Sequence, residues 1–315
     1  MNLLVSLKYL VALDDHGHFG RAALACHITQ PALSNALRAL ESHFDTAIVK
    51  RGRNFAGFTP EGERVLHGAR RMLREDELLE QDLRSSADHP RGRLVIGAVP
   101  TAMPILARFA SMLHARHPGI SPTVRSMSSV ELEDGLKDLA LDLGLGYAER
   151  QGDDSKPRLD VLPQYIEHYF LLRKARTPHP AMLQVGPPMS WREASLLPLC
   201  LLTSGMHNRT IIDRAFGAAG LQPTPAMETN AVLPLALSVL AGDVCSILPG
   251  ALVAVVRGYG GLEALPLVNP TVTVQIAFTW STGVRASRTM DAALQFARED
   301  TWLQHANAHA GSLAA

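Results

Sequence analysis

Apolar residues near the start of the chain recur every three or four positions, which is the spacing of amphipathic helices. Positions 4–11 predict a first helix, and the run at 22–24 begins a second, shorter one. A third helix is expected to start after Thr29, which can cap a helix N-terminus, with Pro31 in the first turn, where its missing N–H has no cost. The pattern therefore predicts three consecutive helices joined by short connections.

The third predicted helix has one apolar and one polar face. Leu33, Leu37 and Leu40 form the apolar stripe, and the opposite face carries Ser34, Asn35, Arg38 and Ser42. Two short helices joined tightly, the second with a polar outward face, are typical of a helix-turn-helix, which presents side chains to the major groove of DNA. Residues 46–59 then predict two short strands about a Gly and Asn turn, with cationic side chains at the tip.

A long uninterrupted helix is predicted from Pro60 to about Ala87. Its apolar residues recur at the a and d positions of a heptad, interrupted by Asp76, and they are Val65, Ala69, Met72, Leu79 and Leu83. Nothing else in residues 61–88 supplies a partner for this stripe within the same domain, so we expect a dimerisation seam. The segment 89–92, which contains a proline and a glycine, ends the helix and marks a domain boundary.

Beyond this boundary, short β-branched runs alternate with helical segments. One such set lies between residues 94 and 147, and a second set of similar layout lies between residues 199 and 248. Two further segments, 165–172 and 272–280, are expected to be strands that cross from one set to the other. The pattern predicts two α/β lobes without a strict sequence repeat.

Small polar residues follow the predicted strands of both lobes. In open α/β sheets, ligands bind beyond the carboxyl ends of the strands, where helix N-termini offer free N–H groups. The candidate residues of such an effector cleft are Thr101, Ala102, Ser128, Ser129, Thr203, Ser204, Thr229 and Asn230. Their hydroxyl and N–H groups suit a small anion, commonly a carboxylate, although helix capping explains Ser, Thr and Asn at these positions about as well.

The sequence predicts the charge and the width of the effector cleft less clearly. Arg125, His207 and Arg209 follow strand ends, but such residues are more often on the surface, and we leave them out of the candidate set. The two prolines in residues 100–104 would narrow a cleft and favour a compact ligand.

The overall charge of the chain gives no indication of a partner. Its 315 residues include 30 basic and 30 acidic side chains, so the formal net charge is zero, and 47% of the residues are hydrophobic. That apolar content excludes intrinsic disorder as the main state, and any nucleic-acid binding must come from local charge. Residues 1–60 hold six basic and four acidic side chains, so a single copy is expected to bind DNA weakly.

Cysteine usage and apolar runs favour a cytoplasmic protein without membrane association. The 3 cysteines are too scattered for a disulfide framework, and no small-residue cleavage site follows the apolar start. No run approaches the roughly 20 uninterrupted apolar residues of a membrane span. The sequence also lacks nucleophile-elbow, Walker and dinucleotide motifs, and its histidine pairs lack a third metal ligand. We therefore expect no enzyme, no cofactor and no metal.

The residues described so far resemble the LysR-type bacterial transcriptional regulators over nearly the whole chain. Residues 29–34, Thr-Gln-Pro-Ala-Leu-Ser, with Arg38 are similar to the recognition helix of that family, and Arg51 with residues 58–62 is similar to its wing and linker entry. In the C-terminal part, several softer patterns follow in the family's order, at residues 93–97, 117–119, 141–146 and 241–249.

Three positions depart from the family pattern. Asn35 stands where the family commonly has a basic residue or glutamine. Since asparagine can pair with adenine, we expect a different base preference. Residues 48–49 and 242–244 differ as well, in ways typical of core or turn variation.

Cys200 and Cys245 suggest a redox switch, as in peroxide-sensing members of the family, but buried thiols in apolar strands are usually inert.

The resemblance implies a winged helix-turn-helix, a linker helix and a two-lobed effector domain like a periplasmic binding protein. We expect the DNA-binding domain at residues 1–60, the linker at 61–90 and the effector domain at 91–315. Its first lobe would comprise about 91–163 and 270–315, and its second about 164–269. The predicted contacts with DNA are Thr29, Gln30, Pro31, Ser34, Asn35, Arg38, Lys50, Arg51 and Arg53.

The predicted function is sequence-specific promoter binding modulated by a small, anionic effector. The expected partners are double-stranded promoter DNA, the effector, further copies of the chain in a homodimer or homotetramer, and RNA polymerase if the protein activates transcription. The alternative is a cytoplasmic small-solute-binding protein that uses its N-terminal helices only for assembly. The sequence leaves open the effector, the target genes, the oligomer size and the choice between activation and repression.

Overall fold

The computed structural model describes residues 2–50, 52, 55–85, 89–148, 159–175, 182–282 and 286–310, which belong to two compact units. The first unit comprises Met1–Ser86 with Asp138–Ala140, and the second comprises Ala87–Lys137 with Leu141–Ala315. The predicted linker helix packs on the first helix of the chain and is therefore part of the N-terminal unit.

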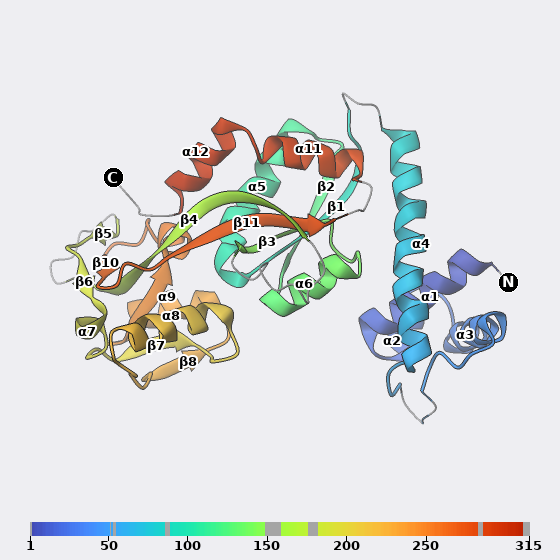
Figure 1. Ribbon diagram of the computed structural model, residues 1–315, viewed down its shortest axis with the longest axis horizontal. Coiled ribbons are helices and arrows are strands. Elements are labelled where there is room, and N and C mark those ends of the chain that lie inside the picture. Colours follow the sequence, from blue (N-terminus) through green and yellow to red (C-terminus); the bar gives the residue numbers. More distant parts are fainter. Residues whose placement is uncertain are drawn as a thin grey trace. The chain divides into compact units, whose positions relative to one another are not determined.

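Helices form the N-terminal unit in the order that the sequence predicts (Figure 1): α1 (Leu3–His16), α2 (Phe19–Ala25), α3 (Gln30–Phe44) and α4 (Pro60–Arg84). Local side chains define where the helices start, since Thr29 Oγ1 accepts from the Ala32 N–H and Thr59 Oγ1 accepts from the Gly62 N–H. The apolar stripe of α3 is buried in the core of this unit, together with Leu7, Leu10 and Leu13 of α1.

The wing is smaller than the predicted pair of strands. Within the described residues of 46–59, one antiparallel bridge joins Val49 to Phe58, and the Lys50 N–H donates to the Gly57 carbonyl at 3.0 Å. The second strand cannot continue because Thr59 caps α4 directly after Phe58. The predicted DNA contacts Arg51 and Arg53 lie outside the described residues.

Helix α4 corrects the prediction that the whole heptad stripe is a seam between two copies. Ala69 is fully buried in the core of the N-terminal unit, and Val65 packs against the same core. The Arg70 side chain fixes this arrangement by donating to Asp14 at 2.6 Å and to Asp15 at 2.9 Å at the end of α1. The first half of the stripe therefore belongs to intradomain packing, whereas Met72, Leu79 and Leu83 remain exposed.

The second unit is a mixed α/β structure with two lobes. In its described residues the strand order is β2-β1-β3-β11-β4-β9-β7-β8, and β10 pairs with β4 as well as with β5 and β6. The first lobe contains β1 (Gly92–Ala98), the 3-10 turn η1 (Pro100–Ala102), α5 (Met103–Arg116), β2 (Ile120–Ser126), α6 (Ser129–Lys137), β3 (Leu143–Tyr147), α11 (Arg288–Phe296) and α12 (Asp300–Ala308).

The second lobe contains β5 (Gln184–Val185), β6 (Met189–Ser190), α7 (Trp191–Ala194), β7 (Leu199–Leu202), α8 (His207–Ala218), β8 (Met227–Thr229), α9 (Val232–Ala241), β9 (Cys245–Pro249), α10 (Gly250–Val255) and β10 (Leu262–Val268). Each lobe has a parallel three-stranded core, with β1 between β2 and β3 and with β7 between β8 and β9.

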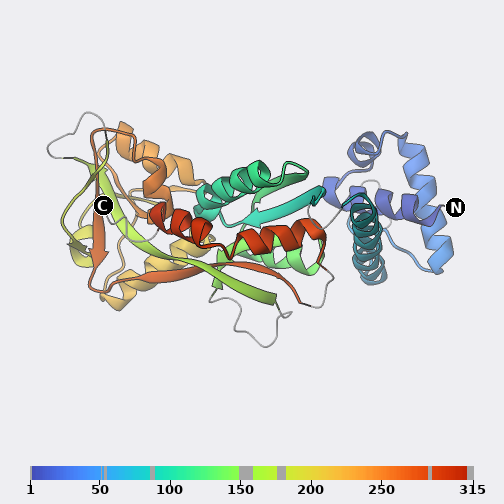
Figure 2. The same ribbon diagram turned by 90° about the horizontal axis from the view of Figure 1, so that it is seen from above.

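Two long antiparallel strands join the lobes, β4 (Leu159–Lys174) and β11 (Thr273–Ser281), as Figures 1 and 2 show. The first part of β4 pairs with β11, and its last residues pair with β9 and β10 of the second lobe. These are the two crossing strands that the sequence predicts, and β4 extends further in both directions than expected. One strand, β4, therefore belongs to the sheets of both lobes.

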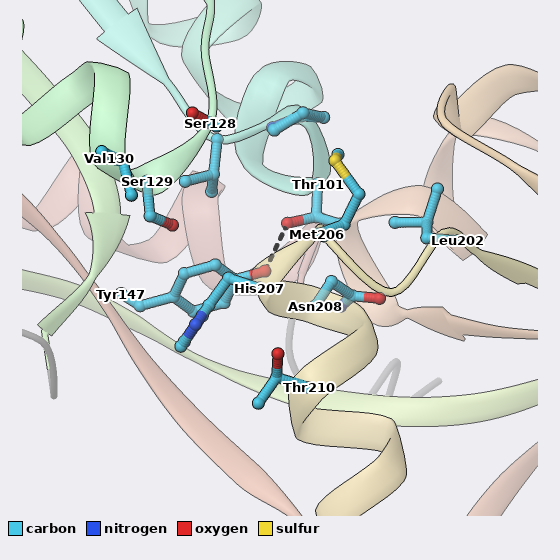
Figure 3. A pocket seen from close by; sticks show the side chains of 13 residues that line it. Thr101, Ser128, Ser129, Val130, Tyr147, Leu202, Met206, His207, Asn208 and Thr210 are labelled. Atoms are coloured by element: carbon cyan, nitrogen blue, oxygen red, sulfur yellow. Dashed lines mark hydrogen bonds between the residues drawn. The ribbon is translucent and has the colours of Figure 1, made fainter.

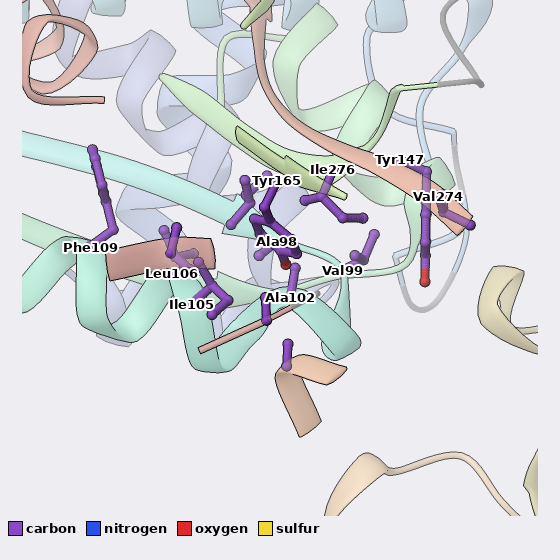
Figure 4. Close-up of a cluster of buried hydrophobic side chains, with 14 of the residues drawn as sticks. Ala98, Val99, Ala102, Ile105, Leu106, Phe109, Tyr147, Tyr165, Val274 and Ile276 are labelled. Carbon is purple, nitrogen blue, oxygen red and sulfur yellow. The ribbon is translucent and has the colours of Figure 1, made fainter. Parts of the chain in front are cut away.

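An aromatic group fills the core of the first lobe. The ring of Phe109 on α5 lies 4.7 Å from that of Phe278 and 4.9 Å from that of Trp302, and the Trp302 indole N–H donates to Gln164 Oε1 at 2.7 Å. Figure 4 places Ala102 in the same core, beside Val99 and Ile105. This packing fixes the chain immediately after β1, where the pocket begins. None of the described helices is long and apolar enough to span a membrane.

Candidate functional site

The exposed face of α3 forms the first candidate site. Gln30, Pro31, Asn35 and Arg38 are exposed on it, and Ser34 is partly buried. Arg38 Nη1 donates to Asn35 Oδ1 at 3.0 Å, so these two predicted base-reading side chains lie together on adjacent turns. The face is presented to solvent because the opposite stripe of α3 is anchored in the core.

Two other predicted DNA contacts have different surroundings. The Thr29 hydroxyl is occupied as the N-cap of α3, which gives it a structural role whether or not it meets a phosphate. Lys50 is exposed beside the single bridge of the wing. Lys50 and the exposed face of α3 thus belong to the same compact unit, and Glu41 is the acidic residue of α3.

A pocket between the lobes forms the second candidate site (Figure 3). It has a volume of about 160 Å³, and its walls come from separate elements. The first lobe contributes residues 99–101 after β1, residues 128–130 at the start of α6, and Tyr147 at the end of β3. The second lobe contributes Leu202 at the end of β7 and the start of α8, at residues 205–208 and 210. The site therefore lies at the carboxyl ends of parallel strands, as predicted.

Three of the eight predicted effector residues line this pocket, namely Thr101, Ser128 and Ser129. The other five, Ala102, Thr203, Ser204, Thr229 and Asn230, do not line it, and their contact with an effector stays a prediction. Ala102 is buried in the core, and Thr229 Oγ1 accepts from the Ala231 N–H in a local turn. The second lobe meets the pocket with the first turn of α8, so the hydroxyls at the ends of β7 and β8 lie outside it.

The adjacent serines of α6 have different roles. The Ser128 N–H donates to the Glu131 carboxylate at 2.7 Å, and Ser128 Oγ accepts from the Glu131 N–H, so this residue closes a capping box. Ser129 is buried, and its hydroxyl has no hydrogen-bond partner in the described part of the chain. Figure 3 shows the Ser129 oxygen among the side chains that line the pocket. A buried hydroxyl without a partner is costly, so this atom marks a place for a ligand or water.

Sequence reasoning predicted Thr101 but missed the polar side chains around it, Tyr147 and Asn208. Thr101 Oγ1 lies 2.9 Å from Tyr147 Oη, and Asn208 Nδ2 donates to the Tyr169 hydroxyl at 3.1 Å. Burial raises the pKa of Tyr147 to about 12, against the opposing effect of its hydrogen bonds to Thr101 and Asn208, so its phenol remains protonated. The His207 ring lies 4.6 Å from the Tyr147 ring. No sequence motif marks these residues, since they meet only through the fold.

The charge of the pocket is low. Among the described residues that line it there is no Lys, Arg, Asp or Glu. Arg209, the cation nearest in sequence, points elsewhere, because its guanidinium pairs with Asp213 and Glu228 and donates to the Leu202 carbonyl. The helices that begin at the pocket, η1 with α5 and α8, have no side-chain cap within the described residues. Pro100 and Pro104 have no N–H, so the first turn of α8 is the main source of free N–H groups, and the helix dipoles are positive at these ends.

Cys200 and Cys245 are not arranged as a disulfide pair. On the parallel strands β7 and β9, Cys200 is opposite Ser246 and Leu199 is opposite Cys245. Since successive strand residues point to opposite faces, the two thiols lie on different sides of the sheet, in different apolar clusters. Burial raises the pKa of the Cys245 thiol, which lowers its thiolate fraction at neutral pH.

This geometry predicts that oxidants leave the pair unlinked. After treatment of the folded protein with hydrogen peroxide, we expect no Cys200–Cys245 disulfide in peptide maps run without reductant. Iodoacetamide at neutral pH is expected to label partly exposed Cys26 faster than either buried cysteine. A stoichiometric cross-link between the two strand cysteines would contradict the structure.

The residues that the structure describes contain no group of three or more His, Cys, Asp or Glu side chains that could hold a metal ion.

Comparison with known proteins identifies both parts of the chain. The family model of the LysR substrate binding domain matches residues 87–302, and that of the bacterial regulatory helix-turn-helix proteins of the lysR family matches residues 4–63. The SDS degradation transcriptional activation protein of Pseudomonas sp. (strain ATCC 19151) is 28% identical over 300 residues, which cover 95% of each chain.

Solved structures share the fold. A full-length cysteine variant of OxyR from Pseudomonas aeruginosa aligns with a TM-score of 0.67 at 24% identity, covering 94% of this chain and 97% of that chain. Full-length CbnR, solved in complex with its target DNA, aligns with a TM-score of 0.63 at 18% identity, covering 96% of this chain and 99% of that chain.

Proposed function

Because the chain belongs to the LysR-type family of DNA-binding transcriptional regulators with an effector-binding domain, we propose that α3 reads promoter DNA and that a small anion in the pocket changes this binding. The family consists of regulators rather than enzymes. The alternative, a solute-binding protein whose N-terminal helices serve only assembly, is not favoured, since the helix-turn-helix match covers residues 4–63.

Direct base reading is assigned to the exposed residues of α3. Asn35 has the geometry to pair with adenine, and Arg38 can reach guanine or phosphate. Lys50, together with Arg51 and Arg53 of the sequence, would contact the backbone or minor groove, where cations add affinity without sequence information. CbnR, which shares the fold, was solved in complex with its target DNA, and this supports DNA binding by the present chain.

This division of roles predicts different results for two alanine variants. Arg38→Ala is expected to lose about fivefold to a hundredfold in affinity for the operator and little for scrambled DNA, because a base contact carries the sequence preference. Lys50→Ala is expected to weaken both complexes equally and to reduce the salt slope by about 1. Fluorescence anisotropy at several salt concentrations measures both quantities, and identical profiles for the two variants would refute the assignment.

The observation that carries the effector proposal is the buried, unpartnered hydroxyl of Ser129, which faces a pocket at the start of α8. A hydroxyl donor beside an uncapped helix N-terminus suits a carboxylate or another small oxyanion. The absence of acidic side chains from the described lining supports the same choice. If the effector binds one arrangement of the two lobes more tightly than another, it shifts the protein toward that arrangement and thereby changes DNA binding.

The direct test is a gel shift of the full-length protein on its own upstream DNA, with and without a panel of small carboxylates and oxyanions. We expect specific binding that one compound changes. Specific binding that no compound alters would contradict the effector proposal, and the absence of specific binding would contradict the assignment of α3.

Self-association and transcription partners complete the proposal. Regulators of this family form oligomers, and the exposed second half of the α4 stripe supports pairing of two copies here. A homodimer or homotetramer would place two recognition helices on one duplex and thereby compensate for the weak charge of a single domain. RNA polymerase becomes a partner if the protein activates transcription.

A further inference from the structure

The lining of the pocket favours one class of ligand among the small anions. We propose that the effector is a monocarboxylate with a short apolar part, its carboxylate between Ser129 and the first turn of α8 and its apolar part against the apolar side chains of the lining. This inference rests on the proposed function, and its argument comes from the charge, the volume and the lining of the pocket.

The available positive charge matches one negative charge. Helix α8 and the turn η1 that leads into α5 begin at the pocket without a side-chain cap in the described residues, and a helix dipole is equivalent to about half a positive charge. Helix α6 contributes little, because the Glu131 carboxylate already sits at its N-terminus. No described lining side chain is a Lys or Arg. With the imidazole of His207 neutral, a dianion would leave about one charge uncompensated in a partly buried site, which is costly.

Two hydroxyls of the lining are available to a ligand, one from each lobe. Ser129 presents its unpartnered oxygen, and Thr210 presents a hydroxyl from the second turn of α8, both visible in Figure 3. By contrast, the hydroxyl of Thr101 is engaged with Tyr147, and that of Ser128 caps α6. The free hydroxyls and the N–H groups of α8 thus converge from two lobes, which is the geometry needed to hold the two oxygens of one carboxylate.

The rest of the lining is apolar. Val99, Pro100 and Val130 come from the first lobe, and Leu202 and Met206 come from the second. An inorganic oxyanion would leave this wall in contact with water, whereas an alkyl group would bury it at roughly 25 cal/mol per Å² of apolar surface. The volume of about 160 Å³ is close to that of a cavity that holds benzene, so about four to six carbons fit.

Isothermal titration of the full-length protein with isovalerate tests this assignment. The comparison compounds are 3-methylbutanamide, which has the same shape without charge, succinate, which is a dianion, and sulfate. We expect isovalerate to bind at least about tenfold more tightly than each of them, because a charge-assisted hydrogen bond is about twice as strong as a neutral one. Failure of isovalerate to bind, or equal or tighter binding of succinate, sulfate or the amide, would overturn the proposal.

Two serine variants locate the carboxylate. Ser129→Ala is expected to weaken isovalerate binding by about tenfold to a hundredfold, because a hydrogen bond to the charged group is lost. Ser204→Ala is the matched control, since Ser204 is exposed and does not line the pocket. If Ser129→Ala shows an altered circular dichroism spectrum, isovalerate affinity is measured for Thr210→Val instead, and the same loss is expected. Equal affinities of wild type, Ser129→Ala and Thr210→Val would contradict the placement.

Operator binding, measured on the same samples, separates this inference from the proposed function. If isovalerate binds but leaves operator affinity unchanged, the ligand class stands and the regulatory role fails. If operator affinity responds to a dianion or sulfate and not to monocarboxylates, the regulatory role stands and the ligand class fails.

Discussion

Replacing Leu79 by glutamate is expected to convert the protein into monomers that bind a two-site operator about a hundredfold more weakly, or worse. Leu79 is 58% exposed near the C-terminal end of α4, in line with Met72 and Leu83, and none of the three belongs to the core of its own unit. A charge in this stripe would have to be desolvated on pairing. Without pairing, the second half-site no longer benefits from effective concentration, a gain of about 10² to 10⁴.

Light scattering after size exclusion gives the mass, and anisotropy on one-site and two-site DNA gives the affinities. We expect the affinity for one-site DNA to remain unchanged, since α3 is far from the substitution in the sequence and the N-terminal core is intact. Leu24→Glu is the matched control, because Leu24 is 76% exposed on α2, outside the stripe. An unchanged oligomer mass in Leu79→Glu would show that α4 does not hold the copies together.

The choice of Leu79 depends on the correction to the heptad stripe. A charge at Ala69 would also lower DNA affinity, but through unfolding, because Ala69 is buried against the core of the N-terminal unit. Only the part of the stripe that stays exposed can test association separately from stability.

Replacing Gly62 by alanine is expected to destabilise the N-terminal unit by about 1–3 kcal/mol, the range of overpacked sites, and to lower operator affinity with it. A methyl group at this position would lie 2.1 Å from the Ile48 carbonyl oxygen and 2.9 Å from the Ile48 carbonyl carbon. Both are backbone atoms and cannot rotate away. The same Ile48 oxygen accepts from the Thr59 N–H at 2.9 Å, so the wing would have to separate from the start of α4.

Gly68 of the same helix provides the control. Nothing lies within 4 Å of a methyl group added there, so Gly68→Ala is expected to stabilise the helix by up to about 1 kcal/mol through propensity alone. Urea denaturation followed by circular dichroism measures both changes in the free energy of unfolding. Effects of the same sign in the two variants would contradict the close approach of Ile48 to Gly62.

The sequence by itself determined the N-terminal helices and the strands and helices of the two parallel cores, in their order. Helix caps such as Thr29 and Thr59 act within three residues, and the stripe of α3 follows from the helical period, so neighbouring positions contain all the necessary information. The same holds for the alternation of strands and helices beyond residue 92 and for the two crossing strands. It also placed the ligand site at strand ends, because that rule depends on topology and not on particular contacts.

Only the tertiary structure decided which side chains meet. Ser128 and Ser129 are equivalent in the sequence, yet one closes a capping box and the other faces the pocket without a partner. Tyr147 and His207 lie sixty positions apart in the sequence, and their rings come together because β3 and α8 end and begin at the same pocket. Val65 and Ala69 belong to the same stripe as Leu79, but only the first two pack in the core of the N-terminal unit. A local pattern fixes the direction of a side chain relative to its own element, whereas its surroundings depend on packing between elements distant in the chain.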